Sequence, residues 1–203
     1  PSWSTARASP TRASRGTTRW RCWTGWRRRS RRAGSTRAAE GAARPGHFDG
    51  MLTVVARLLE AVKPDFAVFG AKDAQQLFLI RELASKKFPD IEIIRAPIIR
   101  ETSGLALSSR NRYLSDEHRA AALQLSAAMR AGFEQAAQGS PSKVVAAARN
   151  EMLKAPEAKL DYVALVDADT FEAVTDGFTG RAILLIAAVV GGTRLIDNID
   201  ITF

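Results

Sequence analysis

Residues 64–98 read PDFAVFGAKDAQQLFLIRELASKKFPDIEIIRAPI, and they indicate the fold class of the chain. The run from Asp65 to Gly70 is short, apolar and closed by glycine, as in a strand, whereas Asp73 to Lys86 has the spacing of a helix. Ile91 to Arg95 is the next expected strand, and Pro97 ends it. Because a helix connects the two strands, the sequence predicts a parallel pair and an α/β fold.

An amphipathic helix is expected just upstream, from Met51 to Val62, with apolar residues at helical spacing and Pro64 as its end. In a parallel sheet, ligands bind at the carboxyl ends of the strands. Residues 70–73 fall at such an end.

A second region follows, and it reads as a small α+β unit. Ser115 is expected to cap a helix that runs to about Ala137, because acidic residues follow it directly. Residues 139–141 then break the chain before a helix from Ser142 to Leu153. The expected strands are Leu160 to Val166, Ala182 to Val190 and Thr193 to Ile199, with a hairpin turn at Gly191-Gly192 between the last two.

Composition narrows the class of protein. The chain has 203 residues, of which 46% are hydrophobic, and it contains no apolar run long enough to span a membrane. Its single cysteine, Cys22, excludes an intrachain disulfide and a cysteine-based zinc cluster. We therefore expect a cytoplasmic globular protein.

Charge is distributed unevenly. Residues 1–43 contain eleven Arg, no Lys and one acid, Glu40, for a formal charge of +10. Because the whole chain carries +9, residues 44–203 carry −1 and are nearly neutral. The basic character that would suggest a nucleic-acid or anionic-membrane partner is thus confined to residues 1–43.

Residues 1–43 also lack Leu, Ile, Val, Met, Phe and Tyr, although they hold all four Trp. A segment without a periodic apolar stripe builds no core, so we expect an unstructured or frame-shifted leader here. Three interpretations stay open: an arm that binds nucleic acid through stacked Trp and paired Arg, a transit peptide, and translation of a G+C-rich gene in a shifted frame. The sequence favours the third, since a transit peptide needs apolar residues and the chain begins with Pro.

Lys72 and Asp73 follow the end of the first expected strand. Backbone N–H groups at a helix N-terminus favour phosphate, and Lys72 adds a point charge there. On these residues alone, the favoured interpretation is a solvated Lys beside an Asp that caps the helix.

Ser108, Ser109 and Arg110 form a second polar group. Hydroxyls and a guanidinium in a loop can bind a triphosphate and stabilise the charge that develops on a leaving pyrophosphate. A serine-rich turn that caps the next helix explains the same run. Two such groups near strand ends favour a nucleotide site and ATP-dependent chemistry.

The remaining polar candidates are less specific. His47 lies in the loop at residues 44–50 and His118 at the exposed start of a helix; neither has a second ligand at metal-binding spacing, so we predict no protein-bound metal. Gln75 and Gln76 point to different sides of one helix, so one could bind a small hydroxy acid while the other is solvated. The chain has no Gly-x-Gly-x-x-Gly and no Walker A motif.

Five stretches occur together in an order typical of pantoate-β-alanine ligases, and the chain resembles that family over residues 44–203. They are RPGHFDG at 44–50, GAKDAQQ at 70–76, PIIRE at 97–101, GLALSSRNRYL at 104–114 and GTRLIDN at 192–198. The motifs do not extend over residues 1–43. The resemblance implies a partial Rossmann-like nucleotidyl-transferase domain at 44–98, a small α+β C-terminal domain at 99–203 that closes over it, and a homodimer.

The resemblance also implies a reaction. In the family, ATP and pantoate form pantoyl adenylate and pyrophosphate, and β-alanine then attacks the mixed anhydride to give pantothenate and AMP. Mg²⁺ would arrive on ATP, held largely by phosphates and water.

By motif position, the resemblance assigns roles to particular residues. Those expected to contact ATP are Gly70, Ala71, Lys72, Asp73, Leu107, Ser108, Ser109 and Arg110, with the backbone of Ile99 beside the adenine. Gln76 and Arg44 would bind pantoate, and His47 would line the active site. The expected catalytic set is His47, Lys72 and Arg110, in which the two cations neutralise the transferring phosphates.

The chain departs from the family pattern in two ways. Ala71 and Ala74 stand where the family has Glu and Tyr, which removes a hydrogen-bond acceptor near the nucleotide. The family's first strand with its His-x-Gly-His-type loop, and its Asn-Pro-x-Gln-Phe segment, do not occur in this sequence. We therefore expect an open sheet edge, exposed apolar faces and impaired activity. Another adenylating enzyme, or a noncatalytic fragment with a basic nucleic-acid-binding arm, stays open as an alternative.

Overall fold

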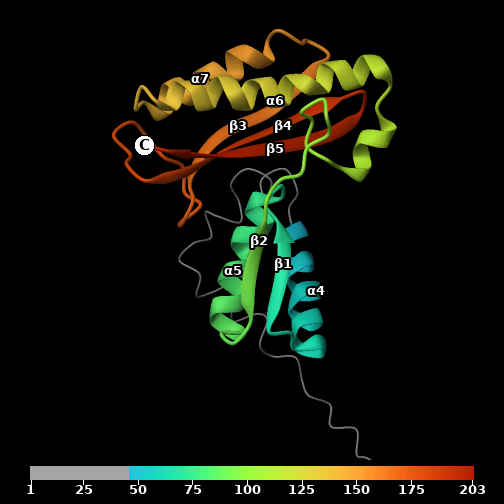
Figure 1. The fold of residues 1–203 in the computed structure, drawn as a ribbon, viewed down its shortest axis with the longest axis vertical. Coiled ribbons are helices and arrows are strands. Elements are labelled where there is room, and N and C mark those ends of the chain that lie inside the picture. Colours follow the sequence, from blue (N-terminus) through green and yellow to red (C-terminus); the bar gives the residue numbers. More distant parts are fainter. Residues whose placement is uncertain (1–45) are drawn as a thin grey trace, which may run out of the picture. The chain divides into compact units, whose positions relative to one another are not determined.

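The fold comes from a computed structural model that describes residues 46–203. The predictions for residues 1–43 and for Arg44 lie outside the described residues. The helices are α4 (His47–Val62), α5 (Ala74–Lys87), η1, a short 3₁₀ helix (Ser109–Tyr113), α6 (Asp116–Ala136) and α7 (Pro141–Met152), and the strands are β1 (Phe66–Gly70), β2 (Glu92–Ala96), β3 (Ala158–Asp167), β4 (Arg181–Val190) and β5 (Thr193–Thr202) (Figure 1). Among these helices, none has the length and apolarity that a membrane span requires.

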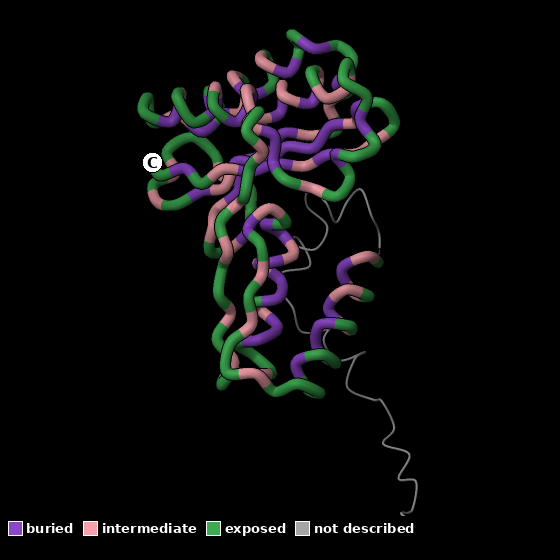
Figure 2. The backbone as a smooth tube through the Cα atoms, turned by 45° about the vertical axis from the view of Figure 1, so that its right-hand side comes forward, coloured by how far each residue is buried: buried purple, intermediate pink, exposed green. Residues whose placement is uncertain are grey.

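The predicted parallel pair is confirmed. β1 and β2 run parallel in a register from Phe66 opposite Glu92 to Gly70 opposite Ala96, and α5 connects them. Large apolar side chains on one face of this pair, Phe66, Val68 and Ile94, are exposed, and Figure 2 shows few buried positions along these two strands. In the described part of the chain, the pair therefore has one apolar face that α5 does not cover.

The helix before β1 begins earlier than predicted. α4 starts at His47 rather than at Met51, directly after Gly46, whose φ of 78° lets the chain turn into the helix. The apolar stripe also begins earlier than predicted, because Phe48 in the first turn is buried and lies four residues before Leu52. His47, expected in a loop, is thus the first residue of a helix.

The three remaining strands form an antiparallel sheet in the order β3-β4-β5. β4 and β5 are joined through Gly191 and Gly192, with φ of 54° and 76°, so both turn residues lie in the left-handed region that a tight two-residue hairpin demands. β3 and β5 extend beyond their predicted ends, because the residues there, several of them polar, still pair with β4.

The main core lies between this sheet and two helices. Figure 1 shows α6 and α7 over one face of the β3-β4-β5 sheet, and buried residues concentrate there in Figure 2. As predicted, Ser115 caps α6: its hydroxyl oxygen accepts a hydrogen bond of 3.2 Å from the His118 backbone N–H. The fully buried side chains of this core include Leu125 and Met129 of α6, Val144 of α7, and Leu184 and Ile186 of β4.

The opposite face of the sheet packs against the start of α5. Ala74 belongs to a small apolar cluster with Val166, Phe171 and Leu185, and the rings of Phe78 and Phe171 stack with centroids 5.2 Å apart. This packing brings the loop between β1 and α5 to the antiparallel sheet, which positions the site described next.

Candidate active site

The first predicted group lies in the loop after β1. Gly70 is the last residue of that strand, and the backbone N–H of Ala71 donates to the Ala96 carbonyl at 2.8 Å. Asp73 occupies the N-cap of α5, but its side chain makes no capping hydrogen bond. The carboxylate therefore leaves the first N–H groups of α5 uncapped, at the end of the helix that favours anions. Residues 70–73 are called the Lys72 segment below.

The second group lies on η1 and on the chain that leads to it. The Ile99 carbonyl accepts a hydrogen bond of 2.8 Å from the Leu107 N–H, and Arg100 and Ala106 form an isolated antiparallel β-bridge. Residues 99–107 therefore double back on themselves. Ser108 then caps η1, because its hydroxyl accepts from the Arg110 N–H at 3.3 Å. The expected serine cap thus belongs to η1, while Ser115 caps α6. Residues 99–111 are called the Arg110 segment.

The structure brings residues of both segments together. Lys72, Ser108 and Arg110 line one pocket, called the Arg110 pocket. Lys72 also lines an adjoining pocket with His47 and Gln76, called the Gln76 pocket. Lys72 therefore lies where the two pockets meet, and Asp73 lines the second of them.

Several predicted residues lie outside these two pockets. Ile99 and Leu107 are exposed, and Ser109 is exposed on η1. Gly70 and Ala71 form the strand side of the Lys72 segment. The expectation that one of the two glutamines is solvated is wrong, because Gln75 is only 3% exposed among the apolar residues of α5 and lines the Gln76 pocket together with Gln76.

A pocket larger than these two lies elsewhere on the described residues. It is lined by Ala71, Ala74 and residues of α5, β4 and β5, with the ion pairs Arg95–Asp200 and Arg181–Asp169 among its charged groups. Its cations are balanced by carboxylates. The Arg110 pocket is lined by Lys72, Arg110 and Arg194 against Asp197, and of these three cations Arg194 is paired with Asp161. The smaller pocket is thus the better match for a polyphosphate.

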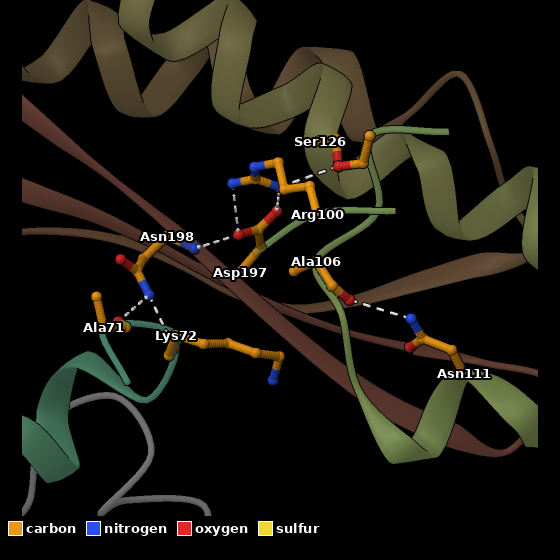
Figure 3. Close-up of polar contacts among 9 residues, drawn as sticks. Ala71, Lys72, Arg100, Ala106, Asn111, Ser126, Asp197 and Asn198 are labelled. Atoms are coloured by element: carbon orange, nitrogen blue, oxygen red, sulfur yellow. Dashed lines mark hydrogen bonds and ion pairs between the residues drawn. The ribbon is translucent and has the colours of Figure 1, made fainter. Parts of the chain in front are cut away.

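Two buried polar residues of β5 had no predicted role. The Asn198 amide donates to the carbonyls of Ala71, at 3.0 Å, and Lys72, at 2.8 Å (Figure 3). The Asp197 carboxylate accepts from the guanidinium of Arg100, at 2.7 and 3.0 Å. The signal in the sequence is a pair of consecutive polar residues flanked by Ile196 and Ile199, at the end of the GTRLIDN motif at 192–198.

Within residues 46–203, no group of three or more His, Cys, Asp or Glu side chains could hold a metal ion. The arrangement instead offers cations, hydroxyls and uncapped N–H groups, which are donors toward an anionic ligand.

Comparison with known proteins agrees with these features. A family model described as pantoate-beta-alanine ligase matches residues 29–200, so the match begins upstream of Arg44, further toward the N-terminus than the five motifs extend. The pantothenate synthetase of Thermobifida fusca (strain YX) is 49% identical over 170 residues, which cover 82% of this chain and 57% of that protein.

Two solved structures are also similar. The pantothenate synthetase of Thermus thermophilus matches with a TM-score of 0.77 and 42% identity, over 81% of this chain and 60% of that one. The pantoate-beta-alanine ligase of Francisella tularensis matches with a TM-score of 0.60 and 31% identity, over 82% of this chain and 55% of that one. The chain thus spans a little over half the length of these relatives, and it belongs to the pantoate-β-alanine ligase family.

Proposed function

We propose that this chain carries the ATP-binding and pantoate-binding part of a pantoate-β-alanine ligase. The observation that carries the proposal is the position of Lys72, which lines the Arg110 pocket with Ser108 and Arg110 and the Gln76 pocket with His47. A cation shared by two pockets suits a reaction in which a phosphate in one pocket is attacked by a group held in the other.

In the proposed reaction, a carboxylate oxygen of pantoate attacks the α-phosphorus of ATP, and the bond to pyrophosphate breaks. The amine of β-alanine then attacks the acyl carbon of pantoyl adenylate, loses a proton and displaces AMP. Lys72 and Arg110 neutralise the negative charge on the phosphates, and the uncapped N-terminus of α5 adds N–H donors. Mg²⁺ enters as part of the MgATP substrate.

The Gln76 pocket is the proposed pantoate site. Gln76 offers an amide to the hydroxyls of this small hydroxy acid, and His47 at the start of α4 lies in the same lining. Arg44, assigned to pantoate by motif position, lies outside the described residues. The Francisella tularensis ligase was crystallised with beta-gamma ATP and β-alanine, which supports the same classes of ligand for this chain.

The finer organisation is also a proposal. Residues 44–98 serve as part of a Rossmann-like nucleotidyl-transferase domain and residues 99–203 as the C-terminal domain that closes over the substrates, in a cytoplasmic homodimer. The leader proposed for residues 1–43 is limited to residues 1–28, because the family match begins at residue 29.

Calorimetric titration with MgATP tests the proposal on the chain as it stands. We expect saturable binding that Lys72→Ala and Arg110→Ala each weaken about tenfold or more, because each loses charge-assisted hydrogen bonds to phosphate worth roughly 1.5–3 kcal/mol. Lys154→Ala is the matched control, since Lys154 is exposed and pairs with Glu151 away from both pockets. Equal losses at all three positions, or no binding by the unaltered chain, would contradict the proposal.

Pyrophosphate release in the presence of single carboxylic acids tests the acid substrate. We expect little turnover from this chain and, above background, a dependence on pantoate rather than on other small acids. A clear preference for an acid unlike pantoate would instead identify another adenylating enzyme. Salt-sensitive binding of nucleic acid that disappears on deleting residues 1–43, without ATP binding, would favour the basic-arm alternative.

A further inference from the structure

Two adjacent residues of β5, Asp197 and Asn198, each bind one of the two segments that carry the phosphate-binding cations. We propose that this pair positions Lys72 relative to Arg110, and therefore sets the affinity of the site for the phosphates of its nucleotide. The inference rests on the proposed function for its ligand, but the mechanical part of it concerns only contacts within the chain.

Asn198 holds the Lys72 segment through the backbone. Its side-chain NH₂ group donates to two consecutive carbonyls, Ala71 at 3.0 Å and Lys72 at 2.8 Å, and the residue is 2% exposed. The orientation of the amide follows from chemistry, because the opposite orientation would place its oxygen against two carbonyl oxygens. Both donors of the NH₂ group are thus used, and they fix the direction of two successive peptide groups.

The consequence for Lys72 is visible in Figure 3. Its backbone carbonyl faces Asn198, while its side chain extends away from that contact. Because the peptide groups on this side of the loop are held by buried hydrogen bonds, the Lys72 Cα is held as well. The side chain of Lys72 therefore extends from a Cα of defined position, although Asn198 does not restrain the side chain itself.

Asp197 holds the Arg110 segment through Arg100. Its carboxylate accepts from Nη1 and Nη2 of Arg100, at 2.7 and 3.0 Å, and the Asp197 side chain is 2% exposed. Arg100 also donates to the Gly104 carbonyl at 3.1 Å, and the Ser126 hydroxyl of α6 donates to the same carbonyl at 2.8 Å. These contacts fix the doubled-back chain that leads directly to Ser108 and Arg110.

The far end of the Arg110 segment is fixed separately. The Asn111 amide donates to the Glu101 carboxylate at 2.7 Å and to the Ala106 carbonyl at 3.1 Å. Arg119 of α6 donates to Glu101 at 2.6 Å. Arg100 and Asn111 therefore hold the segment on both sides of Ser108 and Arg110, and the Asp197 contact ties it to β5.

Consecutive residues of a strand point to opposite faces of the sheet. Asp197 pairs in register with Ile186, a core residue beneath α6, whereas Asn198 pairs with Leu185, which packs with Ala74 of α5. The Asn198 N–H also donates to the Asp197 carboxylate at 2.8 Å. The two segments are thus held by the side chains of two consecutive residues of β5, which one peptide unit joins.

Hydrogen–deuterium exchange tests the mechanical part. Asn198→Asp keeps the shape but turns two donors into an acceptor that faces two carbonyls. We expect amides at 70–73, including the Ala71 N–H bound to Ala96, to exchange about tenfold faster, with α6 and α7 unchanged. Asp197→Asn should accelerate residues 99–111 instead. Asp200→Asn is the control. Asp200 lies on β5 like Asn198 and forms an exposed ion pair with Arg95 of β2, so its replacement should change neither segment.

Nucleotide binding tests the consequence. We expect Asn198→Asp to weaken MgATP about tenfold while adenosine binding stays within about twofold, because only the phosphates contact Lys72. Asn198→Ala, which removes both donors without adding charge, should act in the same direction and covers the case in which Asn198→Asp does not fold. A general structural loss would weaken ATP and adenosine equally, and that result would overturn positioning.

The two proposals can fail separately. Unchanged exchange at 70–73 in a folded Asn198 variant would overturn the inference whatever the chain binds. Faster exchange in a chain that binds no ATP would refute the proposed function, yet it would support the role of Asn198 in holding the Lys72 segment.

Discussion

The guanidinium of Arg100 and the carboxylate of Asp197 form a two-bond ion pair, with Nη1 2.7 Å from Oδ2 and Nη2 3.0 Å from Oδ1. The Asp197 side chain is 2% exposed, whereas that of Arg100 is 32% exposed. Removing the cation therefore leaves a carboxylate that water cannot easily reach. Arg100→Met should lower the free energy of unfolding by about 2 kcal/mol, less than for a fully buried pair because Arg100 is partly solvated.

Urea denaturation measures this loss, and two variants calibrate it. Arg100→Lys should lose less than Arg100→Met, because an ammonium keeps the charge but cannot reproduce both bonds. Arg181→Met breaks the exposed pair with Asp169, at 2.9 Å, whose side chains are 70% and 74% exposed, and should change stability by no more than about 0.5 kcal/mol. Similar losses at Arg100 and Arg181 would show that burial of Asp197 is not the cause.

Asp176 makes the stability of α7 depend on pH. The backbone N–H of Ser142 and then its hydroxyl donate to this carboxylate, with the Ser140 hydroxyl beside them, and together they lower the pKa of Asp176. Because the folded pKa lies below the unfolded value of about 3.9, the stabilisation is present above that value and is lost as pH falls through the folded pKa.

Asp176→Asn should therefore be less stable than the unaltered chain at neutral pH, and the difference should shrink once pH falls below about 4. Thermal unfolding at a series of pH values measures it. Curves for the two proteins that stay parallel down to about pH 2 would mean that this carboxylate does not contribute through its ionised form.

The local elements of the fold could be predicted because their signals are local. The β1–α5–β2 unit was predicted from apolar runs and a helical spacing over residues 65–96. The start of α6 was predicted from Ser115 and the acidic residues that follow it. The start of α4 was missed because Pro45, Gly46 and Gly50 are typical of a loop, although Phe48 lies four residues before Leu52 and is buried.

The site was predicted only in part, because sequence motifs identify residues close together along the chain but not contacts between distant residues. Motif position brought out Lys72, Ser108 and Arg110, which do line one pocket. The Asn198 amide reaches the Lys72 carbonyl across 126 positions of sequence, and no spacing rule links them. Pairing of that kind depends on how β5 meets the β1–α5 loop, which only the assembled structure defines.

Close packing of α6 gives a prediction in which two effects compete. A methyl group added at Gly132 would approach Leu184 Cδ2 to 2.5 Å and the Val144 carbonyl to 3.3 Å. Leu184 is fully buried, so a change of its rotamer would bring it against other core side chains. Gly132→Ala gains up to about 1 kcal/mol in helix propensity but loses about 1–3 kcal/mol to overpacking, so it should destabilise.

Gly50 provides the matched comparison. It lies in α4, is exposed, and an added methyl group would meet no atom within 4 Å. Gly50→Ala should therefore stabilise by roughly 0.5–1 kcal/mol in the same denaturation experiment. Stabilisation by both substitutions would mean that α6 and the sheet can separate to accept the methyl group at Gly132.

Ser108 and Ser115 separate the capping role of a serine from its role at the nucleotide. Both hydroxyls cap a helix, at 3.3 Å to the Arg110 N–H and 3.2 Å to the His118 N–H, but only Ser108 lines the Arg110 pocket.

Ser115→Ala should lower the free energy of unfolding by about 1 kcal/mol and leave MgATP affinity unchanged. Ser108→Ala should weaken MgATP about tenfold, the effect of one hydrogen bond to a charged phosphate. Ser108→Gly retains most of the capping free energy, so a loss of affinity in that variant without a loss of stability would assign the Ser108 hydroxyl to the nucleotide. Unchanged affinity in both Ser108 variants would leave Ser108 with the cap alone.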